Sequence, residues 1–157
     1  MNIAENNPDV MIWLGWREWI ALPELGIDRI KVKVDTGART SALHAFKIET
    51  FHQSGRDRIR FCIHPLQRRS DIERTCTADL VDIRNVMDSG GHREMRFVIM
   101  TPVMIGDKQW PIEITLTDRD IMNFRMLLGR TAMKGRMVIN PGASYLLGKP
   151  PKAKRHR

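Results

Sequence analysis

Residues 29–38 read Arg-Ile-Lys-Val-Lys-Val-Asp-Thr-Gly-Ala, an alternating run followed by a sharp turn. Ile30, Val32 and Val34 fall on one face of the predicted strand, and lysines fall on the other. The turn places the Asp35 carboxylate at the strand end, where the Thr hydroxyl can brace it and Gly permits close backbone approach. The chain holds this Asp-Thr-Gly tripeptide once. We therefore expect a site at the end of this strand with one such carboxylate per chain.

A single carboxylate limits the chemistry that the turn can perform alone. Two carboxylates about 3 Å apart cannot both ionise, so one keeps its proton while the other takes a proton from water. The protonated partner polarises the carbonyl that the water attacks, and the reaction needs neither a metal nor a covalent intermediate. A chain with one Asp-Thr-Gly supplies this pair by associating with a second copy about a two-fold axis. We therefore predict a homodimer in which Asp35 of each subunit contributes to one acid–base pair.

Composition favours one ordinary globular domain. The chain has 157 residues, of which 42% are hydrophobic and 28% charged, so it resembles neither disordered nor membrane proteins. No apolar run approaches the roughly 18 residues of a membrane-spanning helix, and the N-terminus shows no export signal. Cys62 and Cys76 fit a pair of reduced thiols. These features predict a cytoplasmic protein without a membrane partner.

The net charge of +8 is concentrated at the C-terminus. Residues 149–157 contain five Lys and Arg and no acid, and without these five the chain has 21 basic and 18 acidic residues, a net charge of +3. Pro150-Pro151 lies within this segment, which we predict to be a flexible basic tail. Its contacts with nucleic acid would be non-specific, so nucleic acid is not expected as a main partner.

Short alternating runs separated by turn residues dominate the remaining sequence, which is typical of β-structure. We predict a small, mostly antiparallel, closed β-barrel over residues 15–148, preceded by a flexible segment, 1–14. One short helix is expected at 130–134, directly after the apolar run 126–129. The predicted strands are 16–22, 29–34, 46–51, 58–63, 77–86, 95–101, 103–105, 110–116 and 137–139.

The run Leu127-Leu128-Gly129-Arg130 is a second informative element. Gly129 is small enough to allow a close approach, and Arg130 can lock neighbouring loops through a buried or half-buried charge-assisted bond. With the Asp-Thr-Gly turn, this run resembles the pattern of retropepsins, aspartic peptidases in which an apolar-Gly element packs beneath the catalytic turn. The resemblance implies that Asp35 is catalytic and that Gly129 and Arg130 support it.

The similarity covers residues 15–148, and its longest part is 34–45, Val-Asp-Thr-Gly-Ala-Arg-Thr-Ser-Ala-Leu-His-Ala. Shorter parts lie at 15–18, 22–26, 88–91, 94–96, 117–120 and 126–130. This series resembles the bacterial family labelled as ATP-dependent zinc proteases and also described as retropepsin-like, often encoded near ATP-grasp ligases that modify ribosomal proteins. The resemblance implies a retropepsin-like barrel, a peptide or protein substrate and a link to ribosomal-protein modification.

The predicted site extends beyond the catalytic carboxylate. Thr36, Gly37 and Ala38 are expected to support the turn, and the residues that follow are placed closely enough to line a substrate cleft. An Arg in the cleft would favour acidic substrates. These cleft candidates are Arg39, Thr40, Ser41 and His44.

A retropepsin also needs a mobile flap that covers the substrate. Two predicted hairpin tips could serve, 53–56 and 88–91. We favour the second, through Ser89, Gly90 and Gly91, because its glycines give more backbone freedom and its neighbours carry the resemblance.

Two alternatives to a peptidase stay open. The basic tail and Arg39 would also suit a non-catalytic module that binds a peptide or a ribosomal partner. Cys62, His64 and Cys76 would suit a zinc hydrolase, although no fourth ligand is evident and buried strand cysteines usually belong to the core. The sequence has neither a Gly-x-x-x-x-Gly-Lys-Ser/Thr phosphate loop nor a His-Glu-x-x-His motif. We therefore predict no cofactor and no metal.

Overall fold

The structure is a computed structural model that describes residues 11–66, 69–87, 90–118 and 123–149. The described residues form strands almost throughout, with one 3-10 turn, η3 (Pro23–Leu25), and one short helix, α1 (Arg130–Met133). The predicted fold class, mostly β with one short helix after the Leu-Leu-Gly-Arg run, is confirmed. The strands are β1 (Ile12–Leu14), β2 (Arg17–Leu22), β3 (Ile27–Val34), β4 (Ser41–His44), β5 (Phe46–Gln53), β6 (Arg56–Ile63), β7 (Arg74–Met87), β8 (Arg93–Ile105), β9 (Lys108–Thr117), β10 (Met126–Leu128) and β11 (Met137–Ile139).

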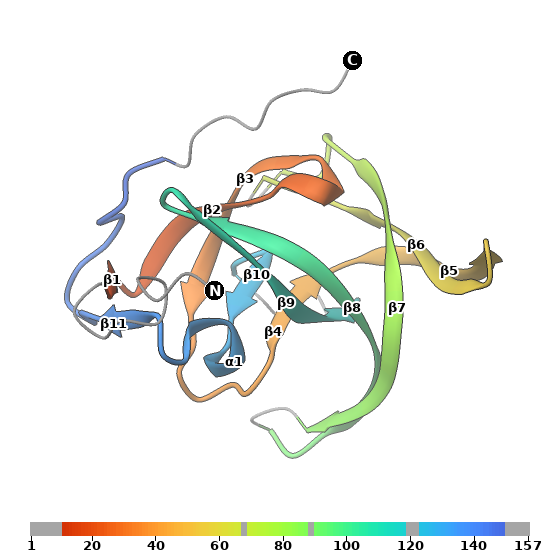
Figure 1. The fold of residues 1–157 in the computed structure, drawn as a ribbon. Helices are drawn as coiled ribbons and strands as arrows, with labels where there is room; N and C mark the ends of the chain where they lie inside the picture. Colours follow the sequence, from red (N-terminus) through yellow and green to blue (C-terminus); the bar gives the residue numbers. More distant parts are fainter. Residues whose placement is uncertain (1–10, 67–68, 88–89, 119–122, 150–157) are drawn as a thin grey trace.

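Nine of these strands form one strongly curled sheet in the order β2-β3-β10-β4-β9-β8-β7-β6-β5 (Figure 1). β2, at one edge of the sheet, also pairs with β8 through a bridge between Ala21 and Met104. This pairing nearly closes the sheet into a barrel. The long hairpin of β7 and β8 and the hairpin of β5 and β6 extend from this ring. Among the described residues, no helix is long and apolar enough to cross a membrane.

The barrel core is built from the apolar positions of the alternating runs. Val32, Met126, Leu43 and Leu116 lie in register across β3, β10, β4 and β9, and all four are buried. Full burial of each such side chain stabilises the fold by about 1.5–3 kcal/mol. A one-residue slip would turn this row outward, so burial fixes the register of the strands that carry the site.

The strand pattern departs from the sequence-based prediction in three places. β1 lies inside segment 1–14, which was expected to be flexible, and pairs in parallel with β11 while Leu14 is fully buried. Residues 1–10 and 150–157 lie outside the described chain. The runs 95–101 and 103–105 form one strand, β8. Pro102 does not interrupt it, because its partner on β9 is Pro111 and neither residue has an N–H that would be left without a ladder hydrogen bond. The short strands β4 and β10 were not predicted.

Candidate active site

Strand β10 lies between β3 and β4 and determines the geometry of the site (Figure 1). It pairs in parallel with β3, where Leu128 is opposite Val34, and antiparallel with β4. Segment 35–40 therefore crosses over the end of β10 to connect its two neighbours. The N–H of Asp35 donates to the carbonyl oxygen of Leu128 at 2.9 Å, which continues the ladder into the turn.

The carboxylate of Asp35 is held by its own turn. Its Oδ1 accepts hydrogen bonds from the N–H groups of Gly37, at 3.0 Å, and Ala38, at 3.2 Å. The side chain is only half-buried, so the carboxylate is fixed in direction and still reached by solvent. A fixed and accessible carboxylate can exchange a proton with a water or a substrate.

Gly129 lies directly beneath this turn. A Cβ atom at this position would be 2.5 Å from the carbonyl carbon of Thr40 and 2.7 Å from the nitrogen of Ser41, closer than real side chains allow. The Gly129 N–H instead donates to Ser41 Oγ at 3.0 Å. The predicted close approach of an apolar-Gly element is therefore present in the described chain.

The start of α1 is bonded to the same segment. The N–H of Arg130 donates to the carbonyl oxygen of Ala38 at 2.8 Å, and that of Thr131 donates to Arg39 at 2.9 Å. The first N–H groups of a helix have no partner within the helix, so the carbonyls of the turn satisfy them. Turn and helix consequently hold each other in place.

The Arg130 side chain makes the expected loop contact, but in a different environment. Its Nη1 donates to the carbonyl oxygen of Thr36 at 3.0 Å, while the side chain is exposed. The expectation of a buried or half-buried bond is wrong, because the helix directs this residue to solvent, where such a contact contributes little. The N–H groups of Gly37 and Ala38 brace the turn, and the contribution of Thr36 stays a prediction.

The four cleft candidates divide into two pairs. Arg39 is exposed and Thr40 half-buried, so both stay at the surface of the turn. Ser41 is fully buried and His44 is 8% exposed. The reason is that β4 has a neighbouring strand on each side and all four of its residues are buried. Within this chain, Ser41 supports the turn from below and His44 lies opposite Thr117.

The flap prediction falls partly outside the described chain. Ser89 is not described, whereas Gly90 and Gly91 are exposed and Gly91 has φ +83°. In Figure 1, the β7–β8 hairpin reaches the lower side of the view, where segment 35–40 also lies, and the β5–β6 hairpin projects to the right. The assignment of Ser89, Gly90 and Gly91 to a flap stays a prediction.

The residues of the zinc alternative are packed separately. Cys62 Sγ lies 3.6 Å from Thr75 Oγ1, whereas Cys76 Sγ donates to the carbonyl oxygen of Leu25 at 3.5 Å. Burial raises the pKa of the Cys76 thiol to about 12. Across the described ranges, no three His, Cys, Asp or Glu side chains are grouped so that they could hold a metal ion.

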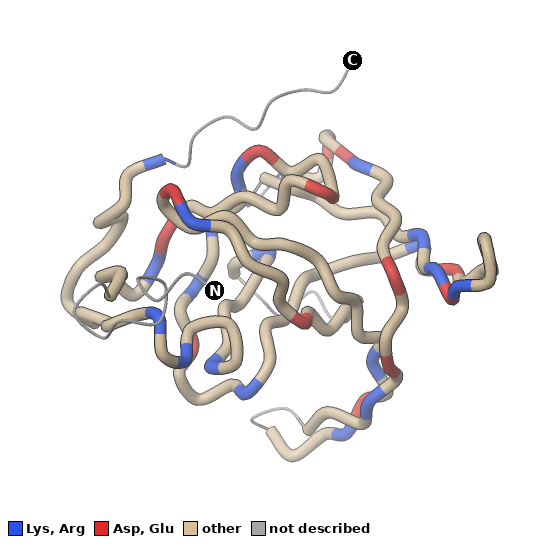
Figure 2. The backbone as a smooth tube through the Cα atoms, in the orientation of Figure 1, with Lys and Arg blue, Asp and Glu red and all other residues tan. Residues whose placement is uncertain are grey.

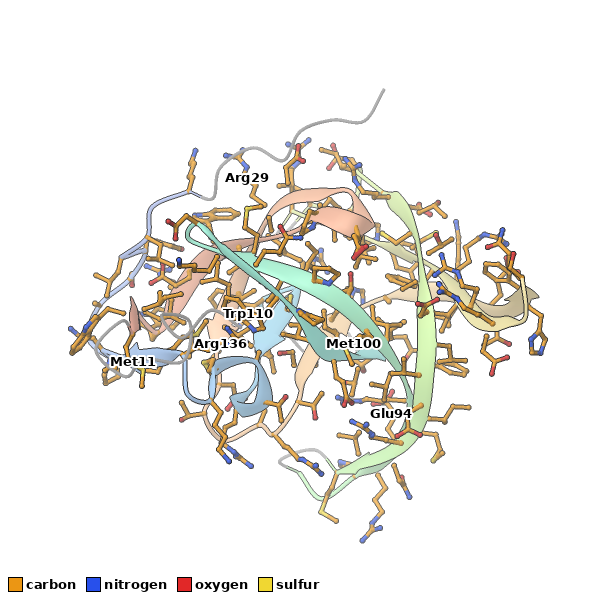
Figure 3. All side chains as sticks on the ribbon, in the orientation of Figure 1. Met11, Arg29, Glu94, Met100, Trp110 and Arg136 are labelled. Carbon is orange, nitrogen blue, oxygen red and sulfur yellow. The ribbon has the colours of Figure 1, made fainter. Side chains whose placement is uncertain are left out.

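Sequence reasoning missed one residue that supports the site. Trp110 of β9 donates from Nε1 to the carbonyl oxygen of Ala132 at 3.1 Å and so anchors α1. Arg136 lies over its ring at 4.6 Å, and Figure 3 labels both side chains beside the helix. Only the pairing of distant segments brings Trp110 to the helix, so no local pattern could have identified it.

The chain matches the model of one protein family and resembles several named proteins. The model of the family described as "RimB-like: Retropepsin-like aspartic endopeptidase RimB" matches residues 13–150. A protein of Desulfotalea psychrophila named "Probable alpha-L-glutamate ligase" is 45% identical over 88% of this chain, and one of Shewanella pealeana with the same name is 43% identical over 86%. The chain spans only 30% of the length of each.

A solved structure shares the fold. It is Lpg0085, a Legionella pneumophila protein of unknown function, with a TM-score of 0.71, 23% sequence identity, and coverage of 86% of this chain and 97% of that one.

Proposed function

Since the chain belongs to the RimB-like family of retropepsin-like aspartic endopeptidases, we propose that it hydrolyses peptide bonds with Asp35 as its catalytic carboxylate. The observation that carries this proposal is the close packing of the catalytic turn, 35–40, against the distant segment 128–131. Gly129 fits beneath the turn, α1 bonds to its carbonyls, and the turn holds Asp35 Oδ1 by two N–H groups. Such a preorganised group loses little entropy when the reaction begins.

The proposed mechanism requires a second copy of the chain. No hydrogen bond or ion pair among the described residues links another carboxylate to Asp35, so the partner acid would be the same residue of a second subunit. The ionised carboxylate takes a proton from water as the water oxygen bonds to the scissile carbonyl carbon. The protonated carboxylic acid gives its proton to the carbonyl oxygen. As the tetrahedral intermediate collapses, the carboxyl that took the water proton gives it to the amine nitrogen and the C–N bond breaks. The other carboxylate regains a proton from a hydroxyl of the intermediate, which restores the pair.

We further propose that the substrate is acidic, with glutamate-containing peptides as the first class to examine. Arg39 and Arg130 are exposed cations beside the catalytic turn, where they would attract a carboxylate-rich segment. The names of the Desulfotalea and Shewanella relatives also refer to glutamate. The ligase activity in those names belongs to proteins of which this chain spans only 30%.

The central experiment compares Asp35→Asn with the native chain on glutamate-rich peptides, with products identified by mass spectrometry. We expect a loss of at least about 1000-fold in kcat/KM, because Asn cannot accept the proton of water. Asp107→Asn, in an exposed turn away from the site, is the matched control and should cleave normally. Equal cleavage by Asp35→Asn and the native chain would refute the mechanism.

Two further measurements separate the proposal from its alternatives. A shared-proton dyad gives a bell-shaped pH profile of kcat/KM. Specific activity should rise with protein concentration in the range where light scattering detects the dimer. A strictly monomeric chain that binds peptides without cleaving them would instead be a binding module.

A further inference from the structure

The outer face of β2 and β3 combines aromatic rings with cations. Trp19 of β2 lies opposite Lys31 of β3, and Arg17 lies opposite Lys33. Because side chains alternate along a strand, these residues and Arg29 point away from the barrel core. The C-terminal segment adds Tyr145. We call this set the cationic aromatic face: Arg17, Trp19, Arg29, Lys31, Lys33 and Tyr145.

The rings hold several of these cations in fixed positions. Trp19 and Tyr145 stack with centroids 6.3 Å apart and an interplanar angle of 24°. The Arg17 guanidinium lies 4.8 Å from the Tyr145 ring centroid, and Lys31 Nζ lies 5.3 Å from that of Trp19. Arg29 also lies over Trp19, at 5.6 Å. Cations held by rings lose less conformational freedom when they bind an anion.

These cations also differ in their partners from those of the β5–β6 hairpin. Arg56 and Arg58 share the carboxylate of Asp79, and Arg60 pairs with Glu49. Figure 2 shows this mixture of charges on the β5–β6 hairpin at the right of the view.

By contrast, within the described residues no carboxylate forms an ion pair with the four cations of the cationic aromatic face, Arg17, Arg29, Lys31 and Lys33. Four cations without an acid leave a positive surface whose charge a polyanion would neutralise.

The C-terminal tail begins next to this face. The N–H of Tyr145 donates to the carbonyl oxygen of Arg17 at 3.0 Å, and the described chain ends shortly afterwards at Lys149. Residues 150–157 add four more Lys and Arg and no acid. Figure 3 labels Arg29 on the upper side of the view.

From this combination of rings and cations that no described carboxylate pairs with, we propose that the cationic aromatic face binds single-stranded nucleic acid. Its cations would contact successive phosphates, and bases would pack on the part of the half-buried Trp19 and Tyr145 rings that stays exposed. An acidic peptide would satisfy the cations but offers no regular series of planar bases to pack on the rings, so nucleic acid fits this face better. Lys33 of this face precedes Asp35 by only two residues, but the proposed binding does not require peptidase activity.

The test measures binding of a fluorescein-labelled 12-nucleotide RNA to the full chain by fluorescence anisotropy, from 50 to 300 mM salt. The face variant is Arg29→Gln/Lys31→Gln/Lys33→Gln. Its affinity at 50 mM salt should fall at least tenfold, and the slope of log K against log salt should become shallower by about 2, since each single-strand phosphate contact contributes about 0.7.

Two variants with the same change in charge serve as controls. Arg74→Gln/Arg93→Gln/Lys108→Gln removes exposed cations of other strands and should change affinity less than twofold. Lys152→Gln/Lys154→Gln/Arg155→Gln alters the tail alone and should have a smaller effect than the face variant. Thermal unfolding checks that each variant is folded, and Asp35→Asn should bind RNA as the native chain does.

Several results would overturn the proposal. They are no binding at 50 mM salt, equal losses in the face variant and in the first control, or loss in the tail variant alone. Displacement of RNA by a poly-glutamate peptide at equal charge concentration, lost in the same face variant, would instead identify a docking site for acidic protein segments.

Discussion

Two carboxylates of this chain, Asp35 and Glu18, make similar hydrogen bonds in opposite settings. Asp35 accepts two N–H groups from residues of its own turn and is half-exposed. Glu18 is fully buried, and its two oxygens accept the N–H groups of Gly15, at 2.6 Å, Leu146, at 3.0 Å, and Leu147, at 3.2 Å. Glu18 thus ties the C-terminal segment to the start of β2.

The difference shows how the position of a carboxylate determines its role. Glu18 faces the interior of the barrel, where it replaces water as the acceptor for three backbone N–H groups of distant segments. Asp35 lies just past the end of a strand, where local donors orient it without covering it. Glu18 is therefore expected to contribute to stability, and Asp35 to chemistry.

Replacement of Glu18 should have the largest effect on stability. Glu18→Ala leaves three N–H groups without their acceptor, so we expect a loss of about 4 kcal/mol in the free energy of unfolding, measured by urea denaturation. Asp35→Ala should cost less than about 1 kcal/mol, because water can reach the freed N–H groups. Equal losses in the two variants would contradict the comparison.

Gly129→Ala breaks the support of Asp35 from below. The added methyl would overlap the backbone at Thr40, which cannot move without displacing the turn, so we expect a loss of about 3 kcal/mol together with most of the peptidase activity. Gly142→Ala is the control, since its new Cβ would lie 3.6 Å from Asn140 Oδ1, an ordinary contact. Normal stability of Gly129→Ala would show that the backbone at Thr40 is not tightly packed against residue 129.

Cys76 extends the comparison to a buried acid that donates a hydrogen bond. Its pKa is raised from 9.0 to about 12 by burial, so the neutral thiol adds stability below pH 9 that is lost progressively between pH 9 and 12. From pH 9 to 10.5, the native chain should lose about 2 kcal/mol more than Cys76→Ala, at about 1.4 kcal/mol per pH unit. Parallel pH curves for the two proteins would exclude a buried neutral thiol.

The smallest effect is expected for Arg130→Gln. This exposed side chain donates one bond to the Thr36 carbonyl, so its loss should change stability by less than about 0.5 kcal/mol. An increase in KM for glutamate-rich peptides, with kcat unchanged, would identify Arg130 as a substrate contact. A loss of 2 kcal/mol or more in urea denaturation would instead show that the bond is structural.

The elements that were predicted correctly each carry a clear local sequence pattern. The run 29–34 and the first four residues of 58–63 alternate between apolar and polar residues, and both runs are strands in the structure. The helix at Arg130 was also predicted, because Gly135 follows it closely. β4 escaped prediction because neighbouring strands bury all four of its residues, which erases the alternation.

By itself, the sequence determined a mostly β chain with a single Asp-Thr-Gly turn and a small residue at Gly129. The tertiary structure alone decided that β10 enters between β3 and β4, that Ser41 lies beneath the turn instead of lining a cleft, and that Glu18 is buried. The physical reason is that alternation encodes which side of a strand is buried. It does not encode which distant strand becomes its neighbour, because that choice depends on packing of the whole barrel.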